Sequence, residues 1–223
     1  IIIFFSSIFL TLNSNFLFFS MNFLCTFFFS IIFFLSLDAQ SEYLNYWSDY
    51  QIKIANNAIN LDYLTLEEKQ VFLILNLARI SPKLFQQHIL QTYQVPDGFS
   101  DDCLNNNRYI NSLSKALLTM SPIGPLSPDK ELWEYATCHA TKSGKRGYVG
   151  HKRVGCPKPD FYSECCSYGF ENAIDIVVQL LIDYQIRDLG HRKIMLDPKQ
   201  KLLGVSIQPH KNYAHNAVLD FSY

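Results

Sequence analysis

Apolar residues fall into blocks of different spacing along the chain, and each spacing predicts a different kind of element. Residues 1–37 form the first block, which has no charged side chain and consists mainly of Phe, Ile and Leu. A run of about 20 apolar residues is long enough to cross a bilayer as a helix. From residue 38 onward polar and apolar residues mix as in a globular protein. The folded part of the chain is therefore expected after this point.

Regular spacing begins near Leu61, and the first helix carries its own start signal. Thr65-Leu66-Glu67-Glu68 is a capping-box pattern, in which the threonine side chain accepts from first-turn amides and Glu68 reaches back to the cap. An apolar stripe at helical spacing follows, made of Val71, Phe72, Ile74, Leu75 and Ala78.

Four further segments have helical spacing. Ser81-Pro82 and Ser127-Pro128 each place a serine cap before a proline, which is favoured at the first position of a helix. The segment that starts at Asn172 is the most apolar of the predicted helices. These predicted helices cover residues 81–91, 108–119, 127–144 and 172–183.

Strand spacing appears near the C-terminus. Residues 202–208 and 217–223 predict two strands, joined by a polar turn at residues 210–216. The stretch 146–169 is rich in glycine, cysteine and aromatic residues and predicts a loop or a short strand. Helices followed by strands indicate an α+β fold. We expect the helices to pack on a small sheet in which the last two strands are antiparallel neighbours.

With 223 residues, the chain suits one well-buried domain. We place it at residues 61–223, after a linker or N-terminal arm at residues 40–60. Residues 1–39 are a signal or a retained anchor. A start at Met21 would make residues 21–39 a signal peptide, cleaved after Leu37-Asp38-Ala39, and would leave residues 1–20 untranslated. We expect a secreted or cell-surface protein, with a membrane anchor as the alternative.

Charge narrows the range of partners. The formal net charge is -1, from 19 Lys and Arg against 20 Asp and Glu. Nucleic-acid binding proteins need a basic surface to neutralise phosphates, and the composition gives no sign of one. We therefore expect no nucleic-acid partner.

Short blocks after residue 64 carry the candidate chemistry. They are Leu75-Asn76-Leu77-Ala78-Arg79, Gly150-His151-Lys152-Arg153, Tyr162-Ser163-Glu164-Cys165-Cys166-Ser167-Tyr168-Gly169, Leu189-Gly190-His191-Arg192 and Val218-Leu219-Asp220-Phe221. In order and spacing, these blocks resemble the signatures of the CAP superfamily, the SCP-like fold of cysteine-rich secretory, antigen and pathogenesis-related proteins. The resemblance runs from about Leu64 to Tyr223. It departs at Ser163 and Cys165, where the family has glycine and asparagine, and its tryptophan is replaced by Leu180 or Leu181.

The resemblance implies a three-layer α-β-α sandwich with a small antiparallel sheet and a cleft that holds histidines and acidic residues. Carried over by position, His151 and His191 resemble the cleft histidines, and Glu164 resembles the acid of the family's Gly-Glu-Asn block. Asp183 stands near the second acidic position. Glu171 is the alternative to Glu164, which we prefer because Ser-Tyr-Gly keeps its place after it.

Two neutral imidazoles and a carboxylate suit zinc or another divalent metal, with water completing the shell. We therefore expect His151 and His191 to be metal ligands, while Asp183 bonds to one imidazole. The same groups suit general acid–base work. His88 and His139 lie at helical positions, and we expect them to pack in the fold or lie at its surface. His210 and His215 are a weaker candidate for a second metal site. Arg79 is expected to support loops by hydrogen bonding.

The cysteines of an exported chain meet an oxidising compartment in which disulfides persist. Cys25 would leave with the signal, and Cys103, Cys138, Cys156, Cys165 and Cys166 remain. We expect one or two bridges and a leftover thiol, with Cys156 bonded to Cys165 or Cys166. A zinc site made of cysteines alone is disfavoured, because the chain has no C-x-x-C pair.

Two functions follow. The resemblance implies a secreted binding module for a lipid, a small apolar molecule or a partner protein. The alternative is a hydrolase that uses His151, Glu164 and His191, with or without a metal. The sequence has no G-x-S-x-G and no H-E-x-x-H motif, and their absence favours the binding module.

Overall fold

The computed structural model describes residues 43–105, 107–160 and 162–223 of the chain. The predicted signal or anchor at residues 1–39, with Met21 and Cys25, lies outside this part. Among the described residues, no helix has both the length and the hydropathy of a membrane span. The elements in chain order are η1 (Tyr43–Tyr46), α2 (Asp49–Ala55), α3 (Leu66–Ile80), α4 (Pro82–Phe85), η2 (Gln86–Leu90), α5 (Arg108–Thr119), β1 (Ser127–Pro128), α6 (Lys130–Arg146), β2 (Ser163–Tyr168), α7 (Ala173–Ile182), α8 (Gly190–Met195), β3 (Leu202–His210) and β4 (Ala214–Ser222).

The predicted first helix is confirmed as α3, and its cap is the one that the sequence predicts. The Thr65 side chain accepts a hydrogen bond from the backbone N–H of Glu68, and the Glu68 carboxylate accepts one from the backbone N–H of Thr65. The same carboxylate is buried and also accepts from the N–H of Ile207 on β3, at 2.9 Å. One capping residue therefore also ties the helix to the sheet.

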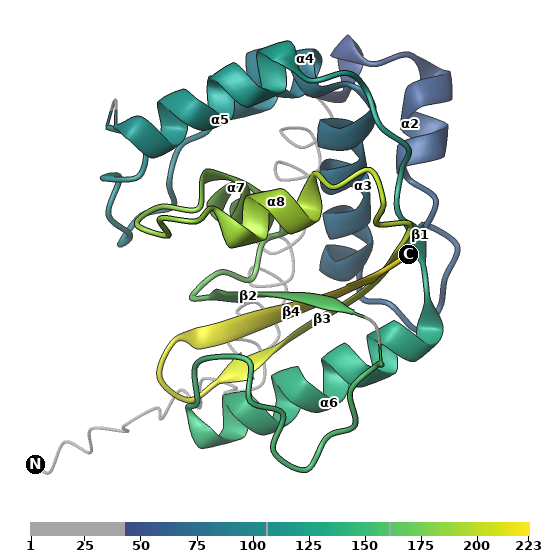
Figure 1. Cartoon of the computed structure of the whole chain (residues 1–223), viewed down its shortest axis with the longest axis vertical. Coiled ribbons are helices and arrows are strands. Elements are labelled where there is room, and N and C mark those ends of the chain that lie inside the picture. The colour runs from purple at the N-terminus through teal and green to yellow at the C-terminus, as the bar shows by residue number, and fades with distance from the viewer. Residues whose placement is uncertain (1–42, 106, 161) are drawn as a thin grey trace, which may run out of the picture. The chain divides into compact units, whose positions relative to one another are not determined.

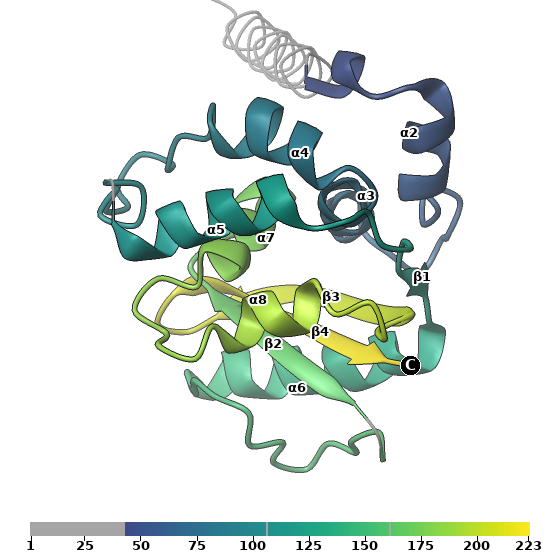
Figure 2. The same cartoon turned by 45° about the horizontal axis from the view of Figure 1, so that its top comes forward.

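Residues 40–60, expected as a linker or arm, contain a helix that the sequence did not predict. Ser48 and Gln51 form a capping box at the start of α2. Ala55 and Ala58 are buried, and α2 packs against α3 (Figure 2). The expectation that regular structure begins near Leu61 is therefore wrong. A helix this short has too few apolar positions to show a period.

The helix α6 starts later than predicted. Ser127 and Pro128 form the strand β1, parallel to β3, instead of a cap and first turn. Asp129 caps the helix by accepting from the N–H of Leu132 at 2.8 Å. A Ser-Pro pair suits an edge strand as well as a helix start, because a proline lacking its N–H is tolerated at a sheet edge. Gly147, at φ +67°, then ends α6 in the left-handed conformation that glycine favours.

The sheet has the order β1-β3-β4-β2. The two predicted C-terminal strands are confirmed as antiparallel neighbours, with Leu203 opposite Phe221, and both extend beyond the predicted bounds. The third strand, β2, lies in the stretch expected to be loop or short strand and pairs antiparallel with β4. The sheet is mixed rather than purely antiparallel, because β1 is parallel to β3.

Helices cover both faces of the sheet. α6 packs on β3 and β4 on one face, and α3, α7 and α8 contact the sheet from the other (Figure 1). α5 lies further out, against α4 and α7 (Figure 2). The predicted α+β fold and its three-layer order are confirmed.

Glycines bring α6 and the sheet unusually close. A Cβ on Gly204 of β3 would lie 2.2 Å from backbone atoms of Leu132 and Trp133 on α6. A Cβ on Gly144 of α6 would lie 2.1 Å from the carbonyl oxygen of Pro209. The helix can approach the strand this closely only because both positions lack a side chain.

Polar residues of α3 hold neighbouring loops in place. Buried Asn76 accepts a hydrogen bond from the N–H of Leu126 at 2.7 Å and donates its amide to the carbonyl of the same residue. Buried Arg79 donates to backbone carbonyls, including those of Gly124 and Met195. The prediction that Arg79 supports loops by hydrogen bonding is confirmed.

Candidate functional site

A cavity of about 600 Å³ lies beside β2, the edge strand of the sheet. Cys166 and Tyr168 of β2 form part of its wall. Residues of α7, α8, the α7–α8 connection, the loop before α5 and the loop after α6 form most of the rest. The wall is rich in apolar and aromatic side chains, including Tyr93, Val95, Phe99, Phe170, Leu180, Ile182 and Tyr184. Its polar groups include His151, His191 and Asp183. The cavity therefore joins a large apolar volume to a few ionisable groups.

His191 and Asp183 come from the two ends of the α7–α8 connection. Asp183 follows α7 in the left-handed conformation, at φ 58°, and Leu189 before α8 does the same at φ 54°. This connection brings the Asp183 Oδ1 to 2.7 Å from Nδ1 of His191, while Oδ2 accepts from the N–H of Arg192 at 3.2 Å. The sequence did not predict α8, because it is short and its cap is not a residue that favours helix starts.

His151 and Glu164 form the second histidine–carboxylate pair. Glu164 lies on β2, and His151 lies on the loop between α6 and β2. Their Nδ1 and Oε1 atoms are 2.7 Å apart. The hydrogen bond to Glu164 raises the pKa of His151, although partial burial opposes this. Burial would raise the pKa of Glu164, but His151 and the charge of Arg153 outweigh it, so that pKa is lowered. Both directions favour an ion pair.

Behind this pair lies a buried charge network. Glu164 and Asp220 face each other across β2 and β4, and two carboxylates directly opposite would repel. The Arg153 guanidinium contacts both, with 2.6 Å to Oδ2 of Asp220. Burial and the nearby Glu164 raise the pKa of Asp220 to about 7, against the lowering effect of Arg153. One guanidinium therefore offsets only part of the charge of two carboxylates.

The structure thus places the four predicted cleft residues in two pairs around one cavity. His151 is with Glu164, and His191 is with Asp183. Both histidines and Asp183 line the cavity wall. Glu171, the alternative acid, lies elsewhere and is 3.6 Å from His215. That the two histidines bind an ion stays a prediction.

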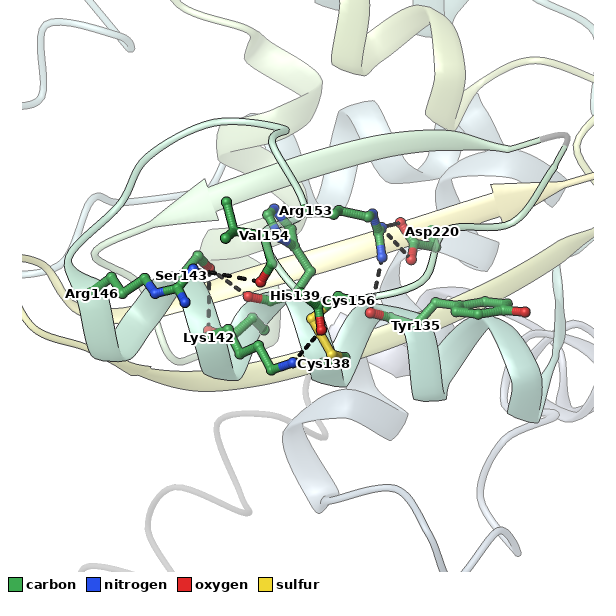
Figure 3. The surroundings of a disulfide bond; sticks show 12 residues. Tyr135, Cys138, His139, Lys142, Ser143, Arg146, Arg153, Val154, Cys156 and Asp220 are labelled. Carbon is green, nitrogen blue, oxygen red and sulfur yellow. Dashed lines mark hydrogen bonds and ion pairs between the residues drawn. A yellow bond between two sulfur atoms is a disulfide. The ribbon is translucent and has the colours of Figure 1, made fainter.

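The predicted bridge from Cys156 to Cys165 or Cys166 is wrong. Cys156 bonds to Cys138 of α6, with 2.07 Å between the sulfurs and 5.7 Å between the Cα atoms. Figure 3 shows this bridge tying the loop after α6 back to the helix. Cys165 and Cys166 are free and buried on β2.

Cys166 lies near His151, with 3.9 Å between Sγ and Nδ1. Burial and the nearby Glu164 raise the pKa of the Cys166 thiol well above its usual range. A nucleophilic cysteine needs the opposite shift. The thiol is therefore protonated and has no sign of activation.

Sequence reasoning missed three residues of this region. Arg153 and Asp220 stood inside recognised blocks without a role, because their contact depends on the pairing of β2 with β4. His139 was expected to pack or lie at the surface, and its packing is confirmed, but its approach to Glu164 was not predicted. It is buried, its Nε2 is 3.0 Å from the carbonyl oxygen of Gly150 and 3.9 Å from Oε1 of Glu164. Its spacing from His151 gave no signal that both reach the same glutamate.

The weaker metal candidate at the C-terminal turn does not form a pair. His210 is buried, with Nε2 3.1 Å from the carbonyl oxygen of Tyr148, and its ring contacts Tyr168 and Tyr213. His215 lies by Glu171. The two histidines thus have separate partners.

No protein-family model matches the sequence, and no curated protein is significantly similar to it. The chemistry of the cavity therefore rests on the geometry of its own residues.

Proposed function

We propose that this chain is an exported binding module of the CAP type, whose cavity takes a small apolar molecule or a lipid chain. The observation that carries the proposal is that His151 and His191, each paired with a carboxylate, line one largely apolar cavity. Small-molecule sites are typically apolar cavities of about 300–1,000 Å³ with a few polar groups that orient the ligand. The apolar part of a ligand would lie against the aromatic wall and its polar end against the histidines.

A divalent ion at His151 and His191 is part of this proposal. In both residues a carboxylate contacts Nδ1, which leaves Nε2 as the nitrogen to offer a metal. This is the usual arrangement around metal-binding histidines, where the carboxylate fixes the ring and raises its basicity. The donor set therefore fits zinc or a similar ion. Such an ion would supply a positive anchor for a carboxylate or phosphate group of the ligand.

The hydrolase alternative is less well supported. It needs a nucleophile or an activated water next to the histidines. The nearest thiol, Cys166, is protonated because burial raises its pKa. The largely apolar wall of the cavity suits an apolar ligand better than a polar substrate. This also favours a binding module over a hydrolase.

Blocking the cavity tests the proposal directly. Ser100 is an exposed residue of the cavity wall, so Ser100→Trp should fill the entrance without disturbing the core. The fluorescent apolar probe anilinonaphthalene sulfonate should bind the full chain and lose affinity at least about tenfold in this variant, a change of about 1.4 kcal/mol. Thr119→Trp, at the exposed end of α5, is the control. Equal binding to all three proteins would reject the cavity as the ligand site.

The ion is tested separately by calorimetry with zinc. His151→Ala and His191→Ala should each abolish zinc binding in the cavity. The site has two histidine ligands, and one alone is too few to hold the ion. Unchanged zinc affinity in both variants would refute this ion while leaving the apolar site untouched.

Export is tested by secretion of the chain expressed from Met21, which deletion of residues 21–39 should abolish.

A further inference from the structure

A second group of metal-binding side chains lies on the α6 side of β2. It consists of His139, Glu164 and Cys166, whose ligand atoms all lie within 4.8 Å of one another. Glu164 and Cys166 are two apart on the strand and so point to the same face. Cys166 packs there against Ala136 and Ala140 of α6. The same helix carries His139, as Figure 3 shows.

The spacing of these atoms suits a tetrahedral ion. Zinc binds nitrogen and oxygen at about 2.0–2.2 Å and sulfur at about 2.3 Å, which places neighbouring ligand atoms about 3.3–3.7 Å apart. Nε2 of His139 is 3.9 Å from Oε1 of Glu164. Because all the ligand atoms lie within 4.8 Å of one another, movements of about 1 Å or less would bring the group into coordination distance.

The electrostatic surroundings also favour a cation. The side chains of Glu164 and Asp220 are 4% and 0% exposed, and Arg153 is the cation that contacts both. Buried charges are costly unless they are paired. With both carboxylates ionised and the His151 imidazole neutral, this group carries one negative charge more than the guanidinium balances, a charge that a proton on His151 otherwise offsets. A divalent ion at Oε1 of Glu164 would supply the missing charge.

We propose that His139, Glu164 and Cys166 form a zinc-type site, with a water as the fourth ligand. The thiolate ligand selects a borderline or soft divalent ion over magnesium or calcium. On binding, the Cys166 thiol loses its proton to solvent and Sγ bonds to the ion. The His139 ring gives up its contact with the Gly150 carbonyl, carries its proton on Nδ1 and bonds through Nε2. His151 keeps its hydrogen bond to Glu164 and orients that carboxylate.

This site shares Glu164 with the His151 pair but uses neither His151 nor His191 as a ligand. It uses neither ring nitrogen of His191, and its thiolate gives a spectroscopic signature that two histidines cannot produce. The proposal therefore does not rest on the proposed function, and the two can fail independently.

Cobalt(II) titration of the full chain tests the site, because cobalt replaces zinc and gives an intense charge-transfer absorption when bound to a thiolate. The wild-type chain should show this band. Cys166→Ser should lose it, with affinity reduced at least about 100-fold, since even outer-sphere partners of a metal are worth about 10–100-fold. His139→Gln should weaken binding similarly, while its amide can still donate to the Gly150 carbonyl.

Two controls separate the outcomes. Cys165→Ser changes the neighbouring thiol, which faces α8 with Sγ 3.9 Å from the His191 carbonyl, and should keep the band. His191→Ala should also keep it. A band that survives Cys166→Ser, or no band in the wild type, would overturn the proposal, and so would cobalt binding that His191→Ala alone abolishes. Urea unfolding of each variant excludes loss of the fold as the cause.

Discussion

At the scale of single residues, two buried arginines, Arg79 and Arg192, bond mainly to backbone carbonyls. Arg79 donates to the carbonyls of Gly124, Met195, Asp197 and Gln200. Burial lowers its pKa to about 10, so it remains charged at neutral pH. The general role of Arg79 was predicted, although three of its carbonyl partners lie more than 100 residues further along the chain. The role of Arg153 was not, because its carboxylate partners meet only when β2 pairs with β4.

Replacing Arg79 with methionine should destabilise the fold strongly. The substitution keeps most of the side-chain volume but leaves several buried carbonyls without a donor, each worth about 1–3 kcal/mol. We expect a loss of at least about 3 kcal/mol in the free energy of unfolding, measured by urea denaturation. Lys83→Met, at an exposed position of α4, should change it by less than about 0.5 kcal/mol. Equal effects would contradict this role.

Asp175 should make stability depend on pH. Burial raises its pKa, although a hydrogen bond from Tyr93 at 2.8 Å opposes the shift. A carboxyl whose pKa is higher in the folded state stabilises the fold at low pH, and this contribution is lost as pH rises from about 4 through the raised pKa. Asp175→Asn, whose amide stays neutral, should therefore have about wild-type stability near pH 4 and become more stable than wild type as pH rises to 7. Urea unfolding across this range measures it. Exposed Asp188→Asn should show no such trend.

At the scale of elements, local sequence patterns defined helices better than strands. The cap at Thr65 and the period of α5 and α7 depend on neighbours in sequence, so they could be recognised. Ser127-Pro128 was misread because its strand pairing with β3 depends on residues far along the chain. The short elements α2, α8 and β2 give too few apolar positions for a period.

The close contact of α6 with β3 should not tolerate a methyl group at Gly204. Gly204→Ala places Cβ against the backbone of α6, which cannot rotate away as a side chain would. We expect a loss of about 1–3 kcal/mol or more in stability, seen as a lower midpoint of thermal unfolding. Gly124→Ala is the matched control, because no atom lies within 4 Å of its added Cβ. A drop of the same size in both would show that close packing at Gly204 is not the cause.

At the scale of the whole molecule, the layer order and the two C-terminal strands were predictable, and the site was predictable as a set of residues. The bond of Asp183 to one imidazole was predicted and is confirmed, but its choice of His191 and the pairing of Glu164 with His151 were not predicted. Whether His151 faces Glu164 or another acid depends on how the loop after α6 folds over β2. The disulfide escaped prediction for the same reason, since sequence spacing does not tell which cysteines a loop brings together.

The bridge between Cys138 and Cys156 should stabilise the whole fold. It closes a loop with a sequence separation of 18 residues, and loops of about 15 residues correspond to about 3 kcal/mol in the chain-entropy treatment. Cys138→Ser should lower the free energy of unfolding by roughly this amount, and Cys103→Ser, a free thiol, should not. Peptide mapping under non-reducing conditions should join Cys156 to Cys138. A peptide joining Cys156 to Cys165 or Cys166 would contradict the structure.

The position of β4 has a consequence for synthesis of the chain. Among the strands of the described residues, β4 is last in sequence yet lies between β3 and β2, and it alone pairs with β2. A nascent chain therefore holds Cys165 and Cys166 on an unpaired segment until β4 has been translated, at about 5–20 residues per second. During that interval oxidation can join Cys156 to either thiol, the bond that the finished fold excludes. Because β4 is translated after β2, the wrong cysteines can bond while the chain is being made. Whenever they do, disulfide exchange must occur before the chain can reach its mature fold.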